Sequence, residues 1–114
     1  MKFNEESRVD TFYCTLHIAG SYDVALQAAK EFAYKHGICF QITKVDYVYT
    51  GGHETGITAR LLKYPRFPKS NDEILDEMKR FAPILAEKMC QKSYTIETTF
   101  DTIYFTSDEP LHRK

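Results

Sequence analysis

The sequence predicts an α+β domain in which a four-stranded antiparallel sheet carries two helices on one face. Four segments alternate apolar and polar residues, which is the period of half-buried strands, and two longer segments repeat apolar residues at helical spacing. At 114 residues the chain fits one domain with its own core, expected over about 8–107. The termini, including the tail 108–114, are expected to fray.

The first strand and the first helix follow each other directly. Gly20 breaks the strand, and Ser21 is expected to cap the helix after it. This helix should end at His36 and Gly37, the usual place for a C-terminal glycine. One face of the strand is apolar and should point into the core: Phe12, Cys14, Leu16 and Ile18.

The middle of the chain predicts two strands joined by a glycine-rich connection at 50–56. The first of them, 38–49, changes its apolar parity near Thr43 and Lys44, which predicts a bulge or a bend. The second ends at a proline-rich segment and should bury Ile57, Ala59 and Leu61.

Ser70 and Glu73 have the spacing of a capping box and predict the start of the second helix. Pro83 falls inside this helix, so we expect a kink or a break into two pieces near Phe81. The segment 94–107 reads as one last strand that changes parity around Asp101.

The predicted order is therefore β-α-β-β-α-β. A split βαβ unit satisfies it. Right-handed crossovers select the ferredoxin-like topology, in which the first and third strands are central.

Composition gives few hints of chemistry. The net charge of −1 excludes a general attraction to nucleic acid or acidic lipid. Three widely separated cysteines argue against a disulfide framework and favour a reducing cytoplasm. No histidine has a Cys or His partner at zinc-ligand spacing, so we expect no metal, no cofactor and no catalytic residue.

The stretch "YVYTGGHETG" is the first candidate binding site. Glycines at this point could form an ordinary hairpin turn, or a nest of backbone N–H groups that holds an anion. No complete phosphate-binding motif is present. The candidate residues are Tyr47, Tyr49, Gly51, Gly52 and His53.

The segment "RLLKYPRFPK" is the second candidate. It interleaves cations and aromatic rings, as a ligand with a phosphate and a base would require. The alternative is a solvated strand end followed by a stiff proline loop. The candidate residues are Arg60, Lys63, Tyr64 and Arg66.

The third candidate is the sheet face that the helices leave open. Strand parity places Tyr13 and His17 on this face beside Arg60 and Tyr64. RNA-recognition motifs use the same two strands, but "GITARLLKY" does not match their pattern. A homo-oligomer interface is the alternative use of such a face.

The run "YVYTGGHETGITARLLKYPRFP", residues 47–68, resembles a segment of small uncharacterised proteins encoded by tailed phages. The resemblance implies a cytoplasmic accessory protein made in an infected bacterium. Such a protein would bind a host protein or sequester a nucleotide signal.

The leading hypothesis is therefore a non-enzymatic binding protein, a homo-oligomer that contacts a host protein through the sheet face and the segment 47–66. One alternative is a binder of a phosphorylated nucleotide, a small ligand held by the Gly-Gly connection and the basic aromatic segment. Another is a single-stranded nucleic-acid binder on the open face. An enzyme ranks last.

Overall fold

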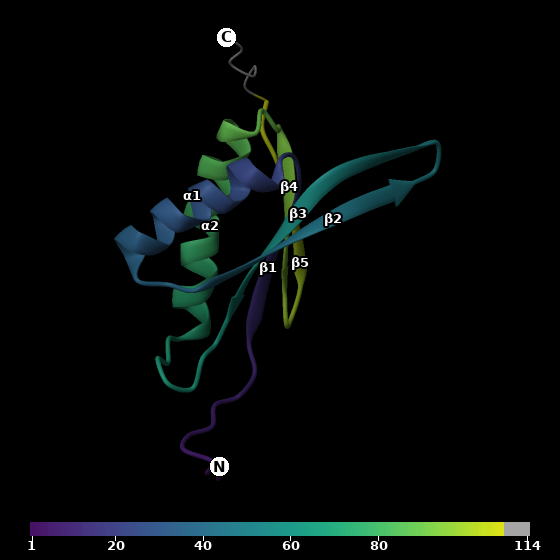
Figure 1. Ribbon diagram of the computed structural model, residues 1–114. Helices are drawn as coiled ribbons and strands as arrows, with labels where there is room; N and C mark the ends of the chain where they lie inside the picture. Colours follow the sequence, from purple (N-terminus) through teal and green to yellow (C-terminus); the bar gives the residue numbers. More distant parts are fainter. Residues whose placement is uncertain (109–114) are drawn as a thin grey trace.

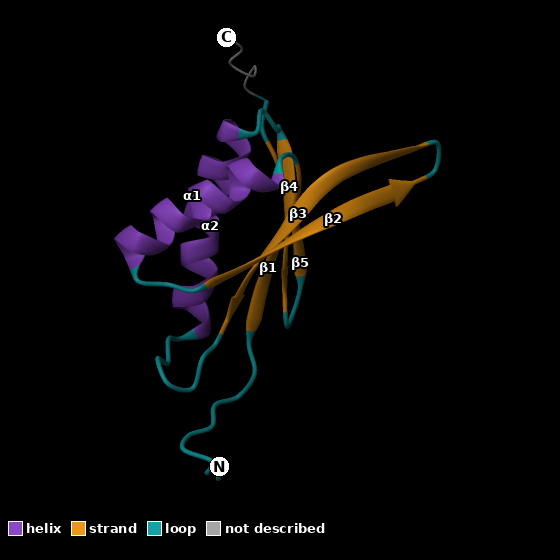
Figure 2. Ribbon diagram, in the orientation of Figure 1, coloured by secondary structure: helices purple, strands orange, loops and turns teal. Residues whose placement is uncertain are grey.

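The computed structural model describes residues 1–108 and contains one sheet and two helices (Figure 1). The strands lie in the order β2-β3-β1-β4-β5, and all neighbours are antiparallel. Both helices cover the same face of the sheet (Figure 2). The elements are β1 Tyr13–Ala19, α1 Tyr22–His36, β2 Phe40–Tyr49, β3 Gly52–Leu62, α2 Asn71–Lys88, β4 Ser93–Thr98 and β5 Thr102–Thr106.

The predicted four-stranded ferredoxin-like sheet is wrong, because the sheet has five strands. The expected single last strand is a hairpin of β4 and β5. Its turn is closed by Thr98, whose backbone N–H donates to the carbonyl of Asp101 at 2.7 Å. The Thr98 hydroxyl oxygen also accepts from the backbone N–H groups of Phe100 and Asp101. The parity change at Asp101 therefore marks a chain reversal.

The core lies between the sheet and the helices, as the alternation in β1 and β3 predicts. Cys14, Leu16 and Ile57 are fully buried on the helix-covered face. Burial raises the pKa of the Cys14 thiol to about 12, so this cysteine is an inert apolar group. The largest fully buried side chains of the helices are Met78, Phe81 and Leu85.

Both predicted helix starts are confirmed. The Ser21 hydroxyl accepts from the backbone N–H of Val24, and Ser70 forms the reciprocal capping box with Glu73. The predicted C-terminal glycine is also confirmed, since Gly37 has a φ of 62°.

The break expected near Phe81 because of Pro83 is wrong, since α2 is one continuous helix from Asn71 to Lys88. Proline removes the hydrogen bond to the carbonyl of Lys79, four residues earlier. Both residues are exposed, so water can satisfy that carbonyl. The helix therefore tolerates the proline on its outer side.

The hairpin of β2 and β3 projects away from the rest of the domain (Figure 1). Its register is unbroken from Phe40 opposite Leu61 to Tyr49 opposite Gly52, so the predicted bulge is wrong. The helices do not cover the outer part of the hairpin. Its apolar side chains therefore need not point to the same face of the sheet as those of the inner part.

The expected connection at 50–56 is also wrong, because only Thr50 and Gly51 lie between the strands. Gly51 has a φ of 82°, which explains the need for glycine there. Gly56 belongs to β3. A Cβ at this position would lie 2.5 Å from the carbonyl oxygen of Ile18, so the two strands approach too closely for any side chain.

The tail that was expected to fray, 108–114, lies outside the described residues apart from Asp108. Within residues 1–108, no helix is both long and apolar enough to cross a membrane.

Candidate functional site on the open face of the sheet

The open face of the sheet is lined by polar side chains in transverse rows. Directly paired residues of adjacent strands point to the same face. The register therefore gives one row across all five strands and a second row beside it. The first consists of Gln41, Arg60, Thr15, Glu97 and Thr102, and the second of Thr43, Thr58, His17, Thr95 and Tyr104.

His17 and Glu97 form a polar pair on this face. Their Nε2 and Oε1 atoms are 2.8 Å apart. The side chains are 32% and 41% exposed, so a ligand can reach them. The His17 ring also meets the edge of the Tyr47 ring, with centroids 6.3 Å apart. This packing holds the imidazole, which in turn orients the carboxylate.

Arg60 lies over the ring of Tyr13, with Cζ at 4.9 Å from the ring centre. Within residues 1–108, no carboxylate accepts a hydrogen bond from this guanidinium. Arg60 and Glu97 flank Thr15 on neighbouring strands, which separates their backbones by about 9.6 Å. The face thus presents a cation and an anion at a fixed spacing.

Tyr47 is fixed by its own hydroxyl, which donates to the carbonyl of Ile57 at 2.8 Å. Burial raises the pKa of the Tyr47 phenol, so it stays neutral. With its hydroxyl occupied, Tyr47 offers mainly a ring surface. We call Tyr13, His17, Tyr47, Arg60 and Glu97 the open-face cluster.

The other residues predicted in the hairpin lie apart from this cluster. The Tyr49 hydroxyl donates to Glu54 at 3.1 Å, and the His53 ring lies 3.3 Å from Asp46. Thr50 and Gly51 form the tip, and Gly52 begins β3. Two carboxylates beside the tip make an anion-binding nest unfavourable, so the hairpin reading fits this stretch better.

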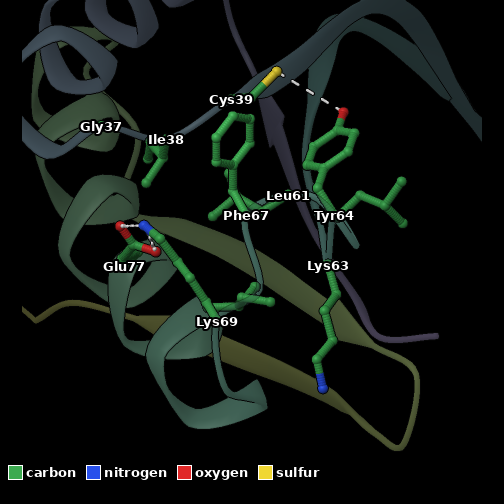
Figure 3. Close-up of a pocket in the computed structure, with 11 residues that line it drawn as sticks. Gly37, Ile38, Cys39, Leu61, Lys63, Tyr64, Phe67, Lys69 and Glu77 are labelled. Atoms are coloured by element: carbon green, nitrogen blue, oxygen red, sulfur yellow. Dashed lines mark hydrogen bonds and ion pairs between the residues drawn. The ribbon is translucent and has the colours of Figure 1, made fainter. Parts of the chain in front are cut away.

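Two of the residues predicted in the basic aromatic segment, Lys63 and Tyr64, line a pocket of about 320 Å³ at the start of α2 (Figure 3). Arg66 does not line it and instead lies over the ring of Phe67, with Cζ at 5.3 Å from the centre. We call this cavity the α2 pocket. Its walls are Gly37, Ile38, Cys39, Leu61, Leu62, Lys63, Tyr64, Phe67, Lys69, Ile74 and Glu77.

An ion pair between a half-buried lysine and a buried glutamate forms the polar part of the α2 pocket. The Lys69 ammonium donates to both carboxylate oxygens of Glu77, at 3.0 and 2.9 Å. Glu77 is only 6% exposed. This makes it an unusual acidic residue on the inner side of α2.

Tyr64 connects the α2 pocket with the open-face cluster. The Cys39 thiol contacts the Tyr64 hydroxyl at 3.8 Å, and this contact and burial raise the pKa of Tyr64. The positive charge of Arg60 lowers the same pKa. Leu62 lines the pocket and is the direct strand partner of Tyr13, so the pocket and the cluster are neighbours.

Sequence reasoning missed Glu97 and Glu77. Glu97 alternates with the buried Ile96, so strand parity alone could have placed it on the open face. Glu77 stands three residues after Ile74 and four before Phe81, which places it on the apolar face of α2. That spacing could have indicated a buried carboxylate. Within residues 1–108, no group of three or more His, Cys, Asp or Glu residues is arranged to hold a metal ion.

Two solved structures of a phage SAM lyase are similar to this chain over nearly its whole length. One is the lyase in complex with S-methyl-5'-thioadenosine, with a TM-score of 0.67 and 13% identity, covering 94% of this chain and 98% of the lyase chain. The other is its apo state, with a TM-score of 0.68 and 15% identity, covering 94% and 99%. Identities this low show a shared fold. No protein-family model and no curated protein matches the chain.

The comparison corrects the functional prediction. A non-enzymatic binding protein is contradicted, since both similar structures are of an enzyme. The two alternative binders fall with it. The resemblance to phage proteins is supported in its general form, because the lyase is a phage protein. The homo-oligomer stays a prediction, which one chain alone does not test.

Proposed function

We propose that this protein is an enzyme that cleaves S-adenosylmethionine (SAM) and releases S-methyl-5'-thioadenosine. The proposal is supported mainly by the structural similarity to a SAM lyase, which extends over nearly the whole length of both chains. The setting is an accessory enzyme made in the cytoplasm of an infected bacterium, as the resemblance of 47–68 to phage proteins implies.

The reaction breaks the bond between the sulfonium sulfur and the γ-carbon of the amino-acid part. The bonding electron pair goes to sulfur, whose positive charge is lost, so the departing thioether needs no proton. A carboxylate next to sulfur would stabilise the charged substrate more than the transition state. We therefore expect the carboxylate of the open-face cluster to bind another part of the substrate and not the sulfonium.

We assign Glu97 to the substrate's ammonium group, whose charge does not change during the reaction. His17 holds the Glu97 carboxylate in place at 2.8 Å. Arg60, about two strand spacings away, faces the adenosine half and can donate to the ribose hydroxyls. In this arrangement the sulfonium lies above Thr15, between the two charged residues, with no opposite charge directly beneath it.

The four-carbon fragment can fill its valence in two ways. Its own carboxylate can attack the γ-carbon and close a lactone, or a proton can pass from the β-carbon to solvent while the C–H bonding pair forms the alkene. The two products are isomers of equal mass, so mass spectrometry alone does not separate them.

The test is to incubate the purified protein with SAM and follow products by proton NMR. We expect the initial rate at which S-methyl-5'-thioadenosine forms to be proportional to the enzyme concentration. A sample of SAM in buffer alone gives the rate of uncatalysed breakdown, which is subtracted. Olefinic signals would identify the alkene, and their absence beside a new lactone would identify ring closure. Formation no faster than in buffer alone would refute the proposed function.

A further inference from the structure

The Lys69–Glu77 pair in the α2 pocket has no evident structural purpose. Glu77 is buried while Lys69 is half-buried, and an ion pair that takes a carboxylate out of water is seldom more stable than well-packed apolar residues of similar volume. Lys69 also stands directly before the N-cap Ser70, where a positive charge opposes the helix dipole. The Lys69–Glu77 pair lines a cavity and is not required by the fold. We therefore infer that it binds a ligand.

The hydrogen-bonding capacity of the pair defines what that ligand must offer. Lys69 donates to both oxygens of Glu77 and so uses two of its three N–H bonds. Each carboxylate oxygen keeps a free lone pair. The pair therefore presents an acceptor beside a donor. The complement is an amino group next to a ring nitrogen, which is the edge of an aminoheterocycle such as adenine.

The rest of the α2 pocket suits a flat ring. Tyr64 and Phe67 bring two aromatic rings to it (Figure 3), and Ile38, Leu61 and Ile74 supply apolar wall. Phe67 is 69% exposed, so its ring is not used by the protein core. The volume of about 320 Å³ lies at the lower end of the range for small-molecule sites.

We propose that the α2 pocket binds the adenine ring of the substrate, with the exocyclic amine donating to Glu77 and a ring nitrogen accepting from Lys69. The identity of the ligand rests on the proposed function, since SAM carries an adenine. Leu62 in the wall of the pocket pairs directly with Tyr13 of the open-face cluster, so a base in the pocket can have its ribose directed to that cluster.

The test uses free adenine, which needs no lyase activity. In a titration of nitrogen-15-labelled protein, adenine should shift the amide signals of Cys39, Leu61 and Glu77 in a saturable way. 6-(Dimethylamino)purine lacks the amine donors and should bind about tenfold more weakly or worse. Phe67→Ala removes an exposed ring without opening the core and should weaken adenine binding at least about fivefold, the size of one stacking contact.

Glu77→Gln should weaken adenine binding about tenfold or more. This substitution also leaves Lys69 without a carboxylate partner, so the melting temperature of the Glu77→Gln protein is measured alongside. If that protein does not fold, the Phe67→Ala protein provides the test of the pocket. The matched control is Glu87→Gln, an exposed residue of the same helix, which should bind as the wild type does.

The proposal is overturned if adenine shifts none of the three pocket amides. It is also overturned if the wild-type protein binds the dimethylated base as tightly as adenine and the Phe67→Ala protein binds adenine as tightly as the wild type does. The outcome is separable from that of the lyase assay. Adenine binding in the pocket without cleavage of SAM supports the pocket and refutes the proposed function. Cleavage of SAM with adenine shifts elsewhere refutes the pocket alone.

Discussion

Replacing Glu97 by Gln is expected to lower kcat/KM for SAM by about 10- to 100-fold, the effect of losing one hydrogen bond between charged groups. The ammonium that Glu97 binds keeps its charge from substrate to transition state. Binding is thus lost equally in both, so KM should rise while kcat changes little. The measurement is the initial rate of S-methyl-5'-thioadenosine release over a range of SAM concentrations.

Glu87→Gln serves as the control, because it makes the same chemical change on the exposed side of α2. It should leave kcat and KM at their wild-type values. Both variants are nearly isosteric, and equal melting temperatures would show that folding is not the cause. Wild-type kinetics for Glu97→Gln would remove this residue from the site.

Phe81→Ala is expected to reduce the free energy of unfolding by about 3–5 kcal/mol. Phe81 is fully buried, and its ring centre lies 5.3 Å from that of Phe32 and 4.5 Å from that of Phe40. These three rings join α2 to α1 and to β2, so the substitution opens a cavity where three elements meet. Urea unfolding monitored by circular dichroism measures the loss.

Ile84→Ala in the same helix is the comparison, since Ile84 is 45% exposed. It should cost less than about 1 kcal/mol, because it leaves no enclosed cavity. A loss for Phe81→Ala as small as that for Ile84→Ala would contradict the packing described for α2.

The parts of the fold that depend on local sequence could be predicted. Ser21, Gly37 and the Ser70–Glu73 box act within one helical turn, and all occur as expected. The strand parity of β1 and β3 also follows from short-range alternation. It brings Tyr13, His17 and Arg60 to one face, as the structure shows.

The predictions that failed concern features set by how segments pair and pack against one another. The β4–β5 turn contains no glycine or proline, and a single aspartate, Asp101, is a weaker turn signal that was interpreted only as a change of parity. The short turn at Gly51 follows from unbroken pairing of β2 with β3, which no residue of the hairpin dictates alone. The role of Glu97 depends on its register with Thr15, and the role of Glu77 on Lys69 folding back over α2.

The most direct test of the open-face site is a titration of nitrogen-15-labelled protein with S-methyl-5'-thioadenosine, the product named for the similar lyase. We expect saturable shifts of the amide signals of Thr15, Arg60 and Glu97, which lie in one row across β3, β1 and β4. Saturable shifts that leave all three of these signals unchanged, or the absence of any saturable shift, would contradict this expectation.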